Sequence, residues 1–413
     1  MADFVTHGEL VDRVAEVDFD RPPALVANAH ITGLGVARAL SEHGVPVIAV
    51  DRTGDGVAPY SDAVDVAGAV TYPLDDPGGF REDVEAIADA TSFDLVGFGC
   101  MDEWVHAFAD TDPEGVTLPF AGKDVVDAVL DKTALYRTAE EFGVPYPETR
   151  WLNDPGTTVE TAVEDLGLPI VVKPALKREF EEAVGTNVIE VETIGELRDV
   201  VAMAEDAGIE VLAQEKVPVA RGEDASLASY VPPSGVDDAI GVVGNATVRN
   251  PLGFGTACVV ERTDLPDLEE RALSILAETG YHGLSEAEFV YDADRETYVL
   301  LDVNTRPWKW IGLPVAAGAN LPMAAYADAT GAEYECASTH EATWVSLPDY
   351  LDVLATADDV ADVLEPSDWR AFLSGDFETR PDLTTGVYRP SDPDPTVQLL
   401  RNEFGDREYY CAC

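Results

Sequence analysis

The sequence predicts a mixed α/β protein with an N-terminal βαβ domain, a larger α+β domain and a small C-terminal region. An apolar strand, a glycine-containing helix and a second strand follow one another between residues 24 and 51. Between residues 131 and 304 the pattern changes from helical spacing to short strands. With 413 residues, of which 46% are hydrophobic, the chain is long enough to fill two or three domains.

The N-terminal unit begins with the apolar run Ala24 to Ala27, continues through a helix that contains Gly33 and Gly35, and reaches a second strand that ends at Asp51. Its GLGVAR segment resembles a dinucleotide fingerprint that lacks the third glycine. Two interpretations stay open. The unit either binds NAD(P) for an oxidoreductase, or its glycines serve close backbone packing.

Polar residues follow two strands of this domain. His30 comes after the first strand and either contacts a substrate or stabilises a turn. Asp102 and Glu103 come after the predicted strand Leu95 to Gly99. Because α/β sheets present such positions to a crevice, both carboxylates are candidates for binding a substrate amine.

A helix is predicted after Asp131, which can cap it, with Leu135, Ala139 and Phe142 on one face. Two strands follow. Residues 169–174 end in Lys173 and a proline, and residues 211–215 are followed by Pro218, which prevents their continuation as a central strand. A lysine at the end of a strand brings a compact positive charge to a cleft wall, where it can neutralise phosphate oxygens.

An antiparallel hairpin is predicted from residues 285–291 and 298–304. Alternation places Glu286 and Glu288 on one face, together with Asp302 and Asn304 of the partner strand. Hard oxygen ligands that converge in this way select Mg²⁺ or Mn²⁺. A solvated acidic face is the alternative, although the apolar neighbours of Asp302 favour burial. Arg306 continues the same alternation and can pair with a phosphoryl oxygen or a carboxylate.

The net charge of −53, from 79 acidic and 26 basic residues, argues against nucleic-acid and anionic-membrane partners. Self-repulsion of this size is screened at molar salt, which indicates a halophilic, salt-rich cytoplasm. Lysine is restricted to positions 123, 132, 173, 177, 216 and 309. The odd number of cysteines predicts no disulfide framework; Cys411 and Cys413 form either a soft-metal site or a plain tail. Without a signal peptide or an apolar span, we expect a cytoplasmic protein.

Five segments in order resemble the ATP-grasp superfamily, and within it the carboxylate-amine ligases closest to D-aspartate ligase: DKTALYRTAEEFGVPYP, PIVVKPA, AQEKVP, SEAEFVYD and LLDVNTRPWKW. The resemblance implies a Rossmann-like pre-ATP-grasp domain at 21–120 after an acidic leader at 1–20. It further implies an ATP-grasp domain at 121–330, with subdomains at 121–210 and 211–330, and an accessory region at 331–413, with a homodimer left open. The implied enzyme joins a small carboxylate to an amine through an acyl phosphate and releases ADP; a catalytically silent nucleotide-binding module is the other possibility.

By this resemblance, Lys132 and Lys173 contact the phosphates of ATP from two sides of a cleft. The adenine hinge would comprise Gln214, Glu215, Lys216 and Val217, and the ribose contact would be Glu223, or Asp224 in its place. Glu288, Asp302 and Asn304 would hold Mg²⁺, with Glu286 an undecided further ligand. Arg306 and Arg249 would contact the phosphoryl group or a substrate carboxylate and, with Lys173, form the catalytic set. Trp308 and Trp310 would wall the acceptor pocket or pack as core.

Two features depart from the family pattern. Gly185 is the single glycine where many members have a glycine-rich phosphate loop. Asp302 stands in place of the usual glutamate, and its side chain is one methylene shorter, which favours monodentate metal binding.

Overall fold

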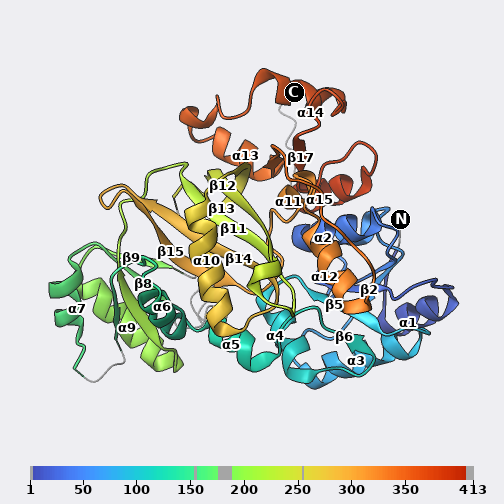
Figure 1. Ribbon diagram of the computed structural model, residues 1–413, viewed down its shortest axis with the longest axis horizontal. Helices are drawn as coiled ribbons and strands as arrows, with labels where there is room; N and C mark the ends of the chain where they lie inside the picture. Colours follow the sequence, from blue (N-terminus) through green and yellow to red (C-terminus); the bar gives the residue numbers. More distant parts are fainter. Residues whose placement is uncertain (1–2, 153–155, 175–187, 254, 406–413) are drawn as a thin grey trace, which may run out of the picture.

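The computed structural model describes residues 3–152, 156–174, 188–253 and 255–405, and these form three β-sheets with helices packed on them (Figure 1). The first sheet belongs to the N-terminal part of the chain. The second is small and lies at the opposite end of the molecule, and the third connects them (Figure 1).

The first sheet has six parallel strands in the order β1-β4-β3-β2-β5-β6. They are β1 (Phe4–Val5), β2 (Ala24–Ala27), β3 (Val47–Asp51), β4 (Val66–Ala69), β5 (Leu95–Gly99) and β6 (Val116–Thr117). Its helices are α1 (His7–Glu16), α2 (Ile31–Ser41), α3 (Pro77–Asp89) and α4 (Asp102–Thr111). The predicted βαβ unit is confirmed as β2-α2-β3. The segment expected to be an acidic leader instead supplies β1 and α1 to this sheet.

The two glycines of the fingerprint-like segment lie within α2 and are required by packing. A Cβ on Gly33 would lie 2.3 Å from the carbonyl oxygen of Asn28, and one on Gly35 would lie 2.5 Å from the Ile311 side chain. The buried Asp51 carboxylate accepts hydrogen bonds from the backbone N–H groups of Ala29 (2.8 Å) and Arg52 (2.7 Å). Gly33, Gly35 and Asp51 therefore have structural roles within this domain. These roles favour the packing interpretation over NAD(P) binding.

The second sheet has four strands in the order β7-β10-β8-β9: β7 (Thr149–Trp151), β10 (Val211–Glu215), β8 (Ile170–Pro174) and β9 (Ile189–Val191). Helices α7 (Val159–Leu166) and α9 (Ile194–Ala207) pack on it around a separate apolar core. Strand β10 pairs with β7 and β8 here, although the predicted subdomain boundary assigns it to the following unit.

Helices α5 (Lys123–Leu130) and α6 (Lys132–Glu141) connect the first two sheets along the chain. The predicted cap is confirmed, because the Asp131 carboxylate accepts a hydrogen bond from the Ala134 N–H at 2.8 Å. Leu135 and Ala139 are buried as expected. The prediction for Phe142 is wrong: this residue follows the last turn of α6 and is 45% exposed, so it no longer shares the buried helix face.

The third sheet has seven strands in the order β15-β14-β11-β12-β13-β16-β17. They are β11 (Asp224–Val231), β12 (Ile240–Asn250), β13 (Thr256–Thr263), β14 (Gly283–Asp292), β15 (Thr297–Asn304), β16 (Thr343–Val345) and β17 (Leu383–Thr385), and α10 (Pro266–Thr279) packs against them. The predicted hairpin is confirmed as β14 and β15, which pair Glu286 with Asn304 and Glu288 with Asp302.

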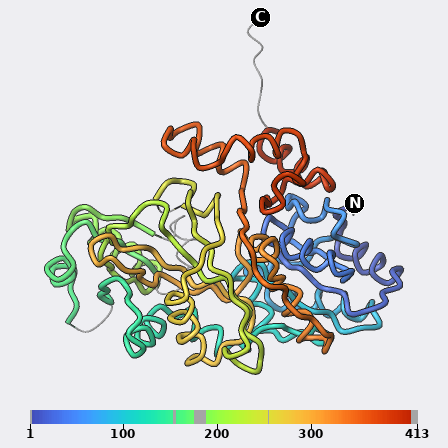
Figure 2. Tube along the Cα trace, turned by 45° about the horizontal axis from the view of Figure 1, so that its top comes forward, coloured from blue at the N-terminus to red at the C-terminus, as the bar shows by residue number. Residues whose placement is uncertain are grey.

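The C-terminal region is more regular than its composition suggests. After α11 (Gly312–Ala316) and α12 (Leu321–Thr330), it adds β16, β17 and the helices α13 (Leu347–Leu354), α14 (Pro366–Ser374) and α15 (Asp394–Phe404). In Figure 2 it lies above the third sheet and reaches the N-terminal part of the chain. No helix in the described part of the chain has both the length and the apolar character needed to cross a lipid bilayer.

Candidate functional site

A cavity of about 680 Å³ lies between the second and third sheets, and it collects most of the residues predicted for the site. That volume is in the range of small-molecule pockets. The predicted residues that line the cavity are Lys132, Lys173, Gln214, Glu215, Lys216, Val217, Asp224, Arg249, Glu286, Glu288, Asp302, Asn304, Arg306, Trp308 and Trp310. Strands β8 and β10 supply one wall, and β11 to β15 supply the other.

The hairpin brings two carboxylates and an amide together at this cavity. Glu288 and Asp302 are cross-strand partners, and the Asn304 amide group donates to Glu288 at 2.7 Å and to Glu286 at 3.2 Å. Asp302 and Asn304 are buried, as the apolar flanking residues predicted. Two carboxylates and an amide oxygen are hard donors that suit Mg²⁺. The described residues contain no group of three or more His, Cys, Asp or Glu side chains able to hold a metal.

Lys132 is paired with a buried carboxylate of the hairpin. Its Nζ lies 2.8 Å from Asp302 Oδ1, and the two side chains are only 4% and 9% exposed. Lys132 is the first residue of α6, directly after the capping residue Asp131, so the helix start fixes where its side chain enters the cavity. Burial of one of these charges without the other would be costly, and the pair thus stabilises both.

The scarce lysines concentrate at this cavity. Four of the six, Lys132, Lys173, Lys216 and Lys309, line it. Lys123 instead pairs with Asp110 at the surface, and Lys177 lies outside the described residues. Lys216 pairs with Glu190 at 2.6 Å. Lys309 pairs with Asp349 at 2.6 Å and donates to Thr256 Oγ1 at 3.1 Å.

Two arginines line the same cavity: Arg249 belongs to β12, and Arg306 lies just after β15. Arg306 Nε lies 2.5 Å from Asp102 Oδ1, so the segment after β15 is joined to the start of α4. Burial opposes its charge, but Asp102, Glu286 and Glu288 outweigh this effect and raise the pKa of Arg306. Arg249 Nε lies 2.7 Å from Asp224 Oδ2.

Glu286 has different partners from Glu288. The Trp310 indole N–H donates to Glu286 Oε1 at 2.8 Å, and Asn304 donates to its other oxygen. Burial, followed by the nearby charge of Glu288, raises the pKa of Glu286 to about 8. Glu286 is therefore held by an indole and an amide at the side of the cavity occupied by Trp308 and Trp310, whose rings meet edge to face with centroids 5.4 Å apart. Both tryptophans are buried, so they act as cavity wall and core together.

The predicted adenine hinge follows β10. The Gln214 side chain is buried and donates to Tyr136 Oη (3.1 Å) and Thr149 Oγ1 (3.0 Å). Glu215 is held by Arg295 at 2.6 Å. Glu223 is exposed and does not line the cavity, whereas its alternative Asp224 does.

Other predicted candidates lie away from the cavity. His30, Asp102 and Glu103 do not line it; Asp102 pairs with the lining residue Arg306, and Glu103 accepts a hydrogen bond from Tyr72 at 3.2 Å. Gly185, Cys411 and Cys413 lie outside the described residues. The sequence analysis missed Asp349, whose carboxylate holds Lys309; no local pattern signals a contact between residues 40 positions apart.

Comparisons with known proteins give distant matches. No protein-family model matches the chain. The carbamoyl phosphate synthase large chain, C-terminal section, of Methanopyrus kandleri is 24% identical over 223 residues, 49% of this chain and 38% of that protein. This chain thus matches well under two thirds of that relative's length.

Solved structures match over most of the chain. N5-carboxyaminoimidazole synthetase from Staphylococcus aureus with ADP aligns with a TM-score of 0.61 at 15% identity, over 88% of this chain and 87% of that one. Biotin carboxylase from Campylobacter jejuni aligns with a TM-score of 0.62 at 15% identity, over 78% and 74%. L-amino acid ligase from Bacillus licheniformis gives 0.54 at 13% identity, over 78% and 76%. At these identities the likeness is one of fold.

Proposed function

We propose that this chain, which has the fold of the ATP-grasp enzymes, is an ATP- and Mg²⁺-dependent ligase that joins a small carboxylate to an amine. The observation that carries the proposal is the meeting of Lys132, Lys173 and the Glu288/Asp302 pair around one cavity in a strongly acidic chain. Such a cavity offers the local positive potential that a triphosphate needs.

In this proposal, each lining residue takes a definite role. Lys132 and Lys173 contact the phosphates, and the backbone of residues 214–217 contacts the adenine ring. Asp224 takes the ribose contact in preference to Glu223, because Asp224 lines the cavity. Glu288, Asp302 and Asn304 hold Mg²⁺, which would neutralise phosphate charge when bound. Arg306 and Arg249 orient the transferred phosphoryl group or the substrate carboxylate.

The reaction requires no side-chain nucleophile. The substrate carboxylate attacks the γ-phosphorus of ATP in line, and ADP leaves as the acyl phosphate forms. The amine then attacks the acyl carbon, the bond to phosphate breaks, and an amide and phosphate result. The protein contributes position and charge: the lysines and arginines offset negative charge on the transferring group, and the cavity walls limit access of water to the acyl phosphate.

The test is incubation of the protein at high salt with Mg-ATP and pools of carboxylic acids and amines, followed by assay of ADP and mass spectrometry of condensed products. A product whose mass equals acid plus amine minus water, formed with one ADP, is expected. ATP binding without ADP release in any pool would indicate a silent nucleotide-binding module. Binding of NADH but not ATP would indicate the oxidoreductase alternative.

Two variants with the same chemical change, one in the cavity and one outside it, separate loss of the proposed metal site from a general effect of removing a carboxylate. Glu288→Gln is expected to abolish ADP release while it preserves the fold, because the amide keeps the shape of the side chain but removes the negative charge that would hold Mg²⁺. Glu278→Gln makes the same chemical change at an exposed position of α10 that does not line the cavity, and it is expected to keep full activity. Equal activity of the two variants would overturn the assignment of the metal site.

A further inference from the structure

The first domain supplies a carboxylate, Asp102, that contacts the wall of the large cavity between the second and third sheets without lining it. Asp102 is the first residue of α4, which follows β5 of the parallel sheet. The connection is tight, because a Cβ on Gly99 would lie 2.6 Å from the backbone nitrogen of Val105. Trp104, Val105 and Phe108 of α4 are buried in the core of this domain. That core therefore fixes the position of the Asp102 backbone.

The Arg306 guanidinium is restrained by this carboxylate and by the adjacent backbone. Its Nε lies 2.5 Å from Asp102 Oδ1, and its Nη1 donates to the Pro307 carbonyl at 3.1 Å. The Arg306 and Asp102 side chains are 14% and 19% exposed, so salt screens their attraction only weakly. The third nitrogen, Nη2, donates to none of the described residues and is not fully buried. Because Arg306 lines the cavity, Nη2 is the nitrogen that it can offer to a ligand.

Two other carboxylates attract the same guanidinium group. Burial lowers the pKa of Arg306, whereas Asp102 raises it; Glu286 and then Glu288 raise it further, each less strongly than Asp102. Glu286 and Glu288 line the cavity, and Glu288 is a proposed ligand of Mg²⁺. Without Asp102, the long arginine side chain would be drawn toward these two acids. A carboxylate behind the cavity wall prevents this movement and takes up no space in the cavity.

We infer that Asp102 is a positioning residue for Arg306: it holds the Nε side of the guanidinium, so that the group stays at the cavity wall for a phosphoryl group or a substrate carboxylate. The inference rests on the proposed function, in which Arg306 orients those groups. It gives the first domain a part in the reaction, because a displacement of about 1 Å in an orienting group costs about 100-fold in rate. Asp102 does not line the cavity, so this role differs from a direct contact with a substrate amine.

Trapping of the acyl phosphate with hydroxylamine tests the inference, with Mg-ATP and an acid that supports ADP release by the native chain. Hydroxylamine attacks the acyl carbon, phosphate leaves, and the hydroxamate is measured by its colour with ferric iron. Asp102→Ala is expected to lower kcat/KM for the acid by about 10- to 100-fold. Its affinity for ADP, which lacks the transferred phosphoryl group, is expected to stay unchanged. Asp102→Asn should fall between Asp102→Ala and the native chain, because its amide oxygen can still accept from Arg306 Nε.

Asp110→Ala is the matched control. It removes an exposed carboxylate of the same helix, one that pairs with Lys123 at the surface, and it is expected to keep full activity. Equal hydroxamate formation by Asp102→Ala and Asp110→Ala would overturn the inference. A parallel loss of ADP affinity in Asp102→Ala would also overturn it, because it would show general damage to the cavity.

Two further measurements separate positioning from a direct substrate contact. In an Arg306→Ala background, Asp102→Ala is expected to cause no further loss of activity, since Asp102 acts through the arginine; the same fold loss in both backgrounds would refute this. A crystal structure of Asp102→Ala gives a result that does not depend on turnover. The Arg306 guanidinium should have moved toward Glu286 or Glu288, and an unmoved guanidinium would refute the inference. If the native chain forms no hydroxamate with any acid, the proposed function fails, and the crystal structure still decides whether Asp102 positions Arg306.

Discussion

The Nζ atom of Lys132 and the Oδ1 atom of Asp302 form a buried ion pair 2.8 Å apart, although 170 positions separate them in the sequence. The pair joins the start of α6 to β15, the strand proposed to hold Mg²⁺. It also means that a divalent cation at Asp302 would share this carboxylate with a resident ammonium group. We therefore expect the site residues to govern stability as well as nucleotide binding.

Lys132→Met should destabilise the fold by about 3–5 kcal/mol, because it removes the ammonium group that pairs with the buried Asp302 carboxylate. The measurement is denaturant-induced unfolding at constant salt. The double variant Lys132→Met/Asp302→Asn should recover part of the loss, since no buried charge remains at this position. A single variant as stable as the native chain would show that Asp302 is satisfied by other groups.

Trp310→Phe should lower the free energy of unfolding by about 1–3 kcal/mol more than Trp308→Phe. Both changes remove one indole ring. The Trp310 indole donates to Glu286, whereas the Trp308 Nε1 has no hydrogen-bond partner within the described residues. Chemical denaturation gives the free energy of unfolding of each variant. The difference between the two losses reports the contribution of the Trp310–Glu286 hydrogen bond. Equal losses in the two variants would mean that ring packing alone matters.

Gly244→Ala should destabilise the wall of the large cavity. A Cβ at Gly244 would lie 2.9 Å from two ring atoms of Trp310 and from a methyl group of Val260. Overpacking of this kind costs about 1–3 kcal/mol, and movement of the indole should change its fluorescence. Gly8→Ala is the control: nothing lies within 4 Å of its Cβ position in α1, so that change should stabilise slightly.

Asp392→Asn should weaken the contact between the C-terminal region and α2, which packs on the first sheet. Burial alone would raise the pKa of Asp392, but hydrogen bonds from Ser61, Arg38 and the Asp62 backbone hold it below its usual value. A lowered carboxyl pKa contributes stability that is complete above the unfolded pKa of about 3.9 and disappears as pH falls through the folded pKa. The stability difference between native chain and variant should therefore be constant near neutral pH and shrink below about pH 4. A difference that grows on acidification would contradict this account.

Salt should stabilise the native chain strongly, because at about 1 M ionic strength the screening length falls to about 3 Å and the self-repulsion of 53 net negative charges is reduced. The thermal unfolding midpoint should rise as potassium acetate is increased. Full stability in dilute buffer would argue against a halophilic origin.

Local patterns were sufficient to predict much of the fold. Alternation in two neighbouring segments indicated the β14–β15 hairpin, and with it a shared face for Glu286, Glu288, Asp302 and Asn304; the structure adds the register, which pairs Glu288 with Asp302. The helix cap at Asp131 could also be predicted from neighbouring residues, because the carboxylate binds an N–H group only three positions away.

The remaining features depend on contacts that no local pattern encodes. Asp349 and Asp392 are two acids among many in the C-terminal region, and only folding brings them to Lys309 and Arg38. The same applies to Asp102, which was proposed as a substrate contact but instead binds Arg306 across 204 positions. Phe142 fits the helical pattern, yet the chain leaves the helix at that residue, and its exposure follows from tertiary position.

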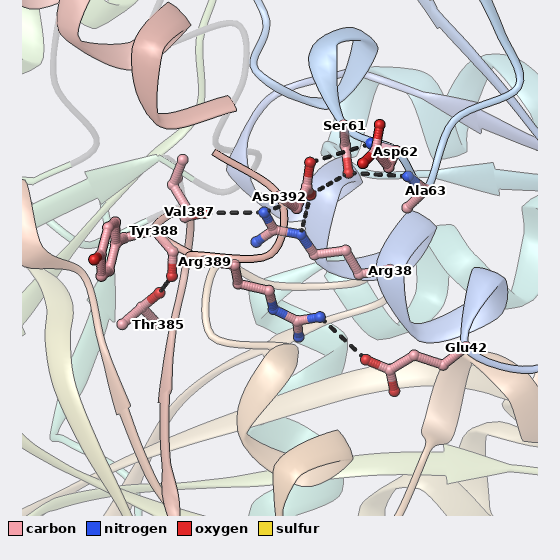
Figure 3. Close-up of polar contacts among 10 residues, drawn as sticks. All are labelled: Arg38, Glu42, Ser61, Asp62, Ala63, Thr385, Val387, Tyr388, Arg389 and Asp392. Atoms are coloured by element: carbon pink, nitrogen blue, oxygen red, sulfur yellow. Dashed lines mark hydrogen bonds and ion pairs between the residues drawn. The ribbon is translucent and has the colours of Figure 1, made fainter. Parts of the chain in front are cut away.

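The place of Asp392 in the sequence has a consequence for biosynthesis. Its carboxylate accepts hydrogen bonds from the Ser61 hydroxyl, the Asp62 backbone N–H and the Arg38 guanidinium (Figure 3). These three residues are translated more than 300 residues earlier. During translation the parallel sheet leaves the ribosome before Asp392 is made, so the buried Arg38 guanidinium then lacks its carboxylate partner. Docking of the C-terminal segment supplies that partner, and a nascent chain truncated before residue 392 would leave this contact unmade.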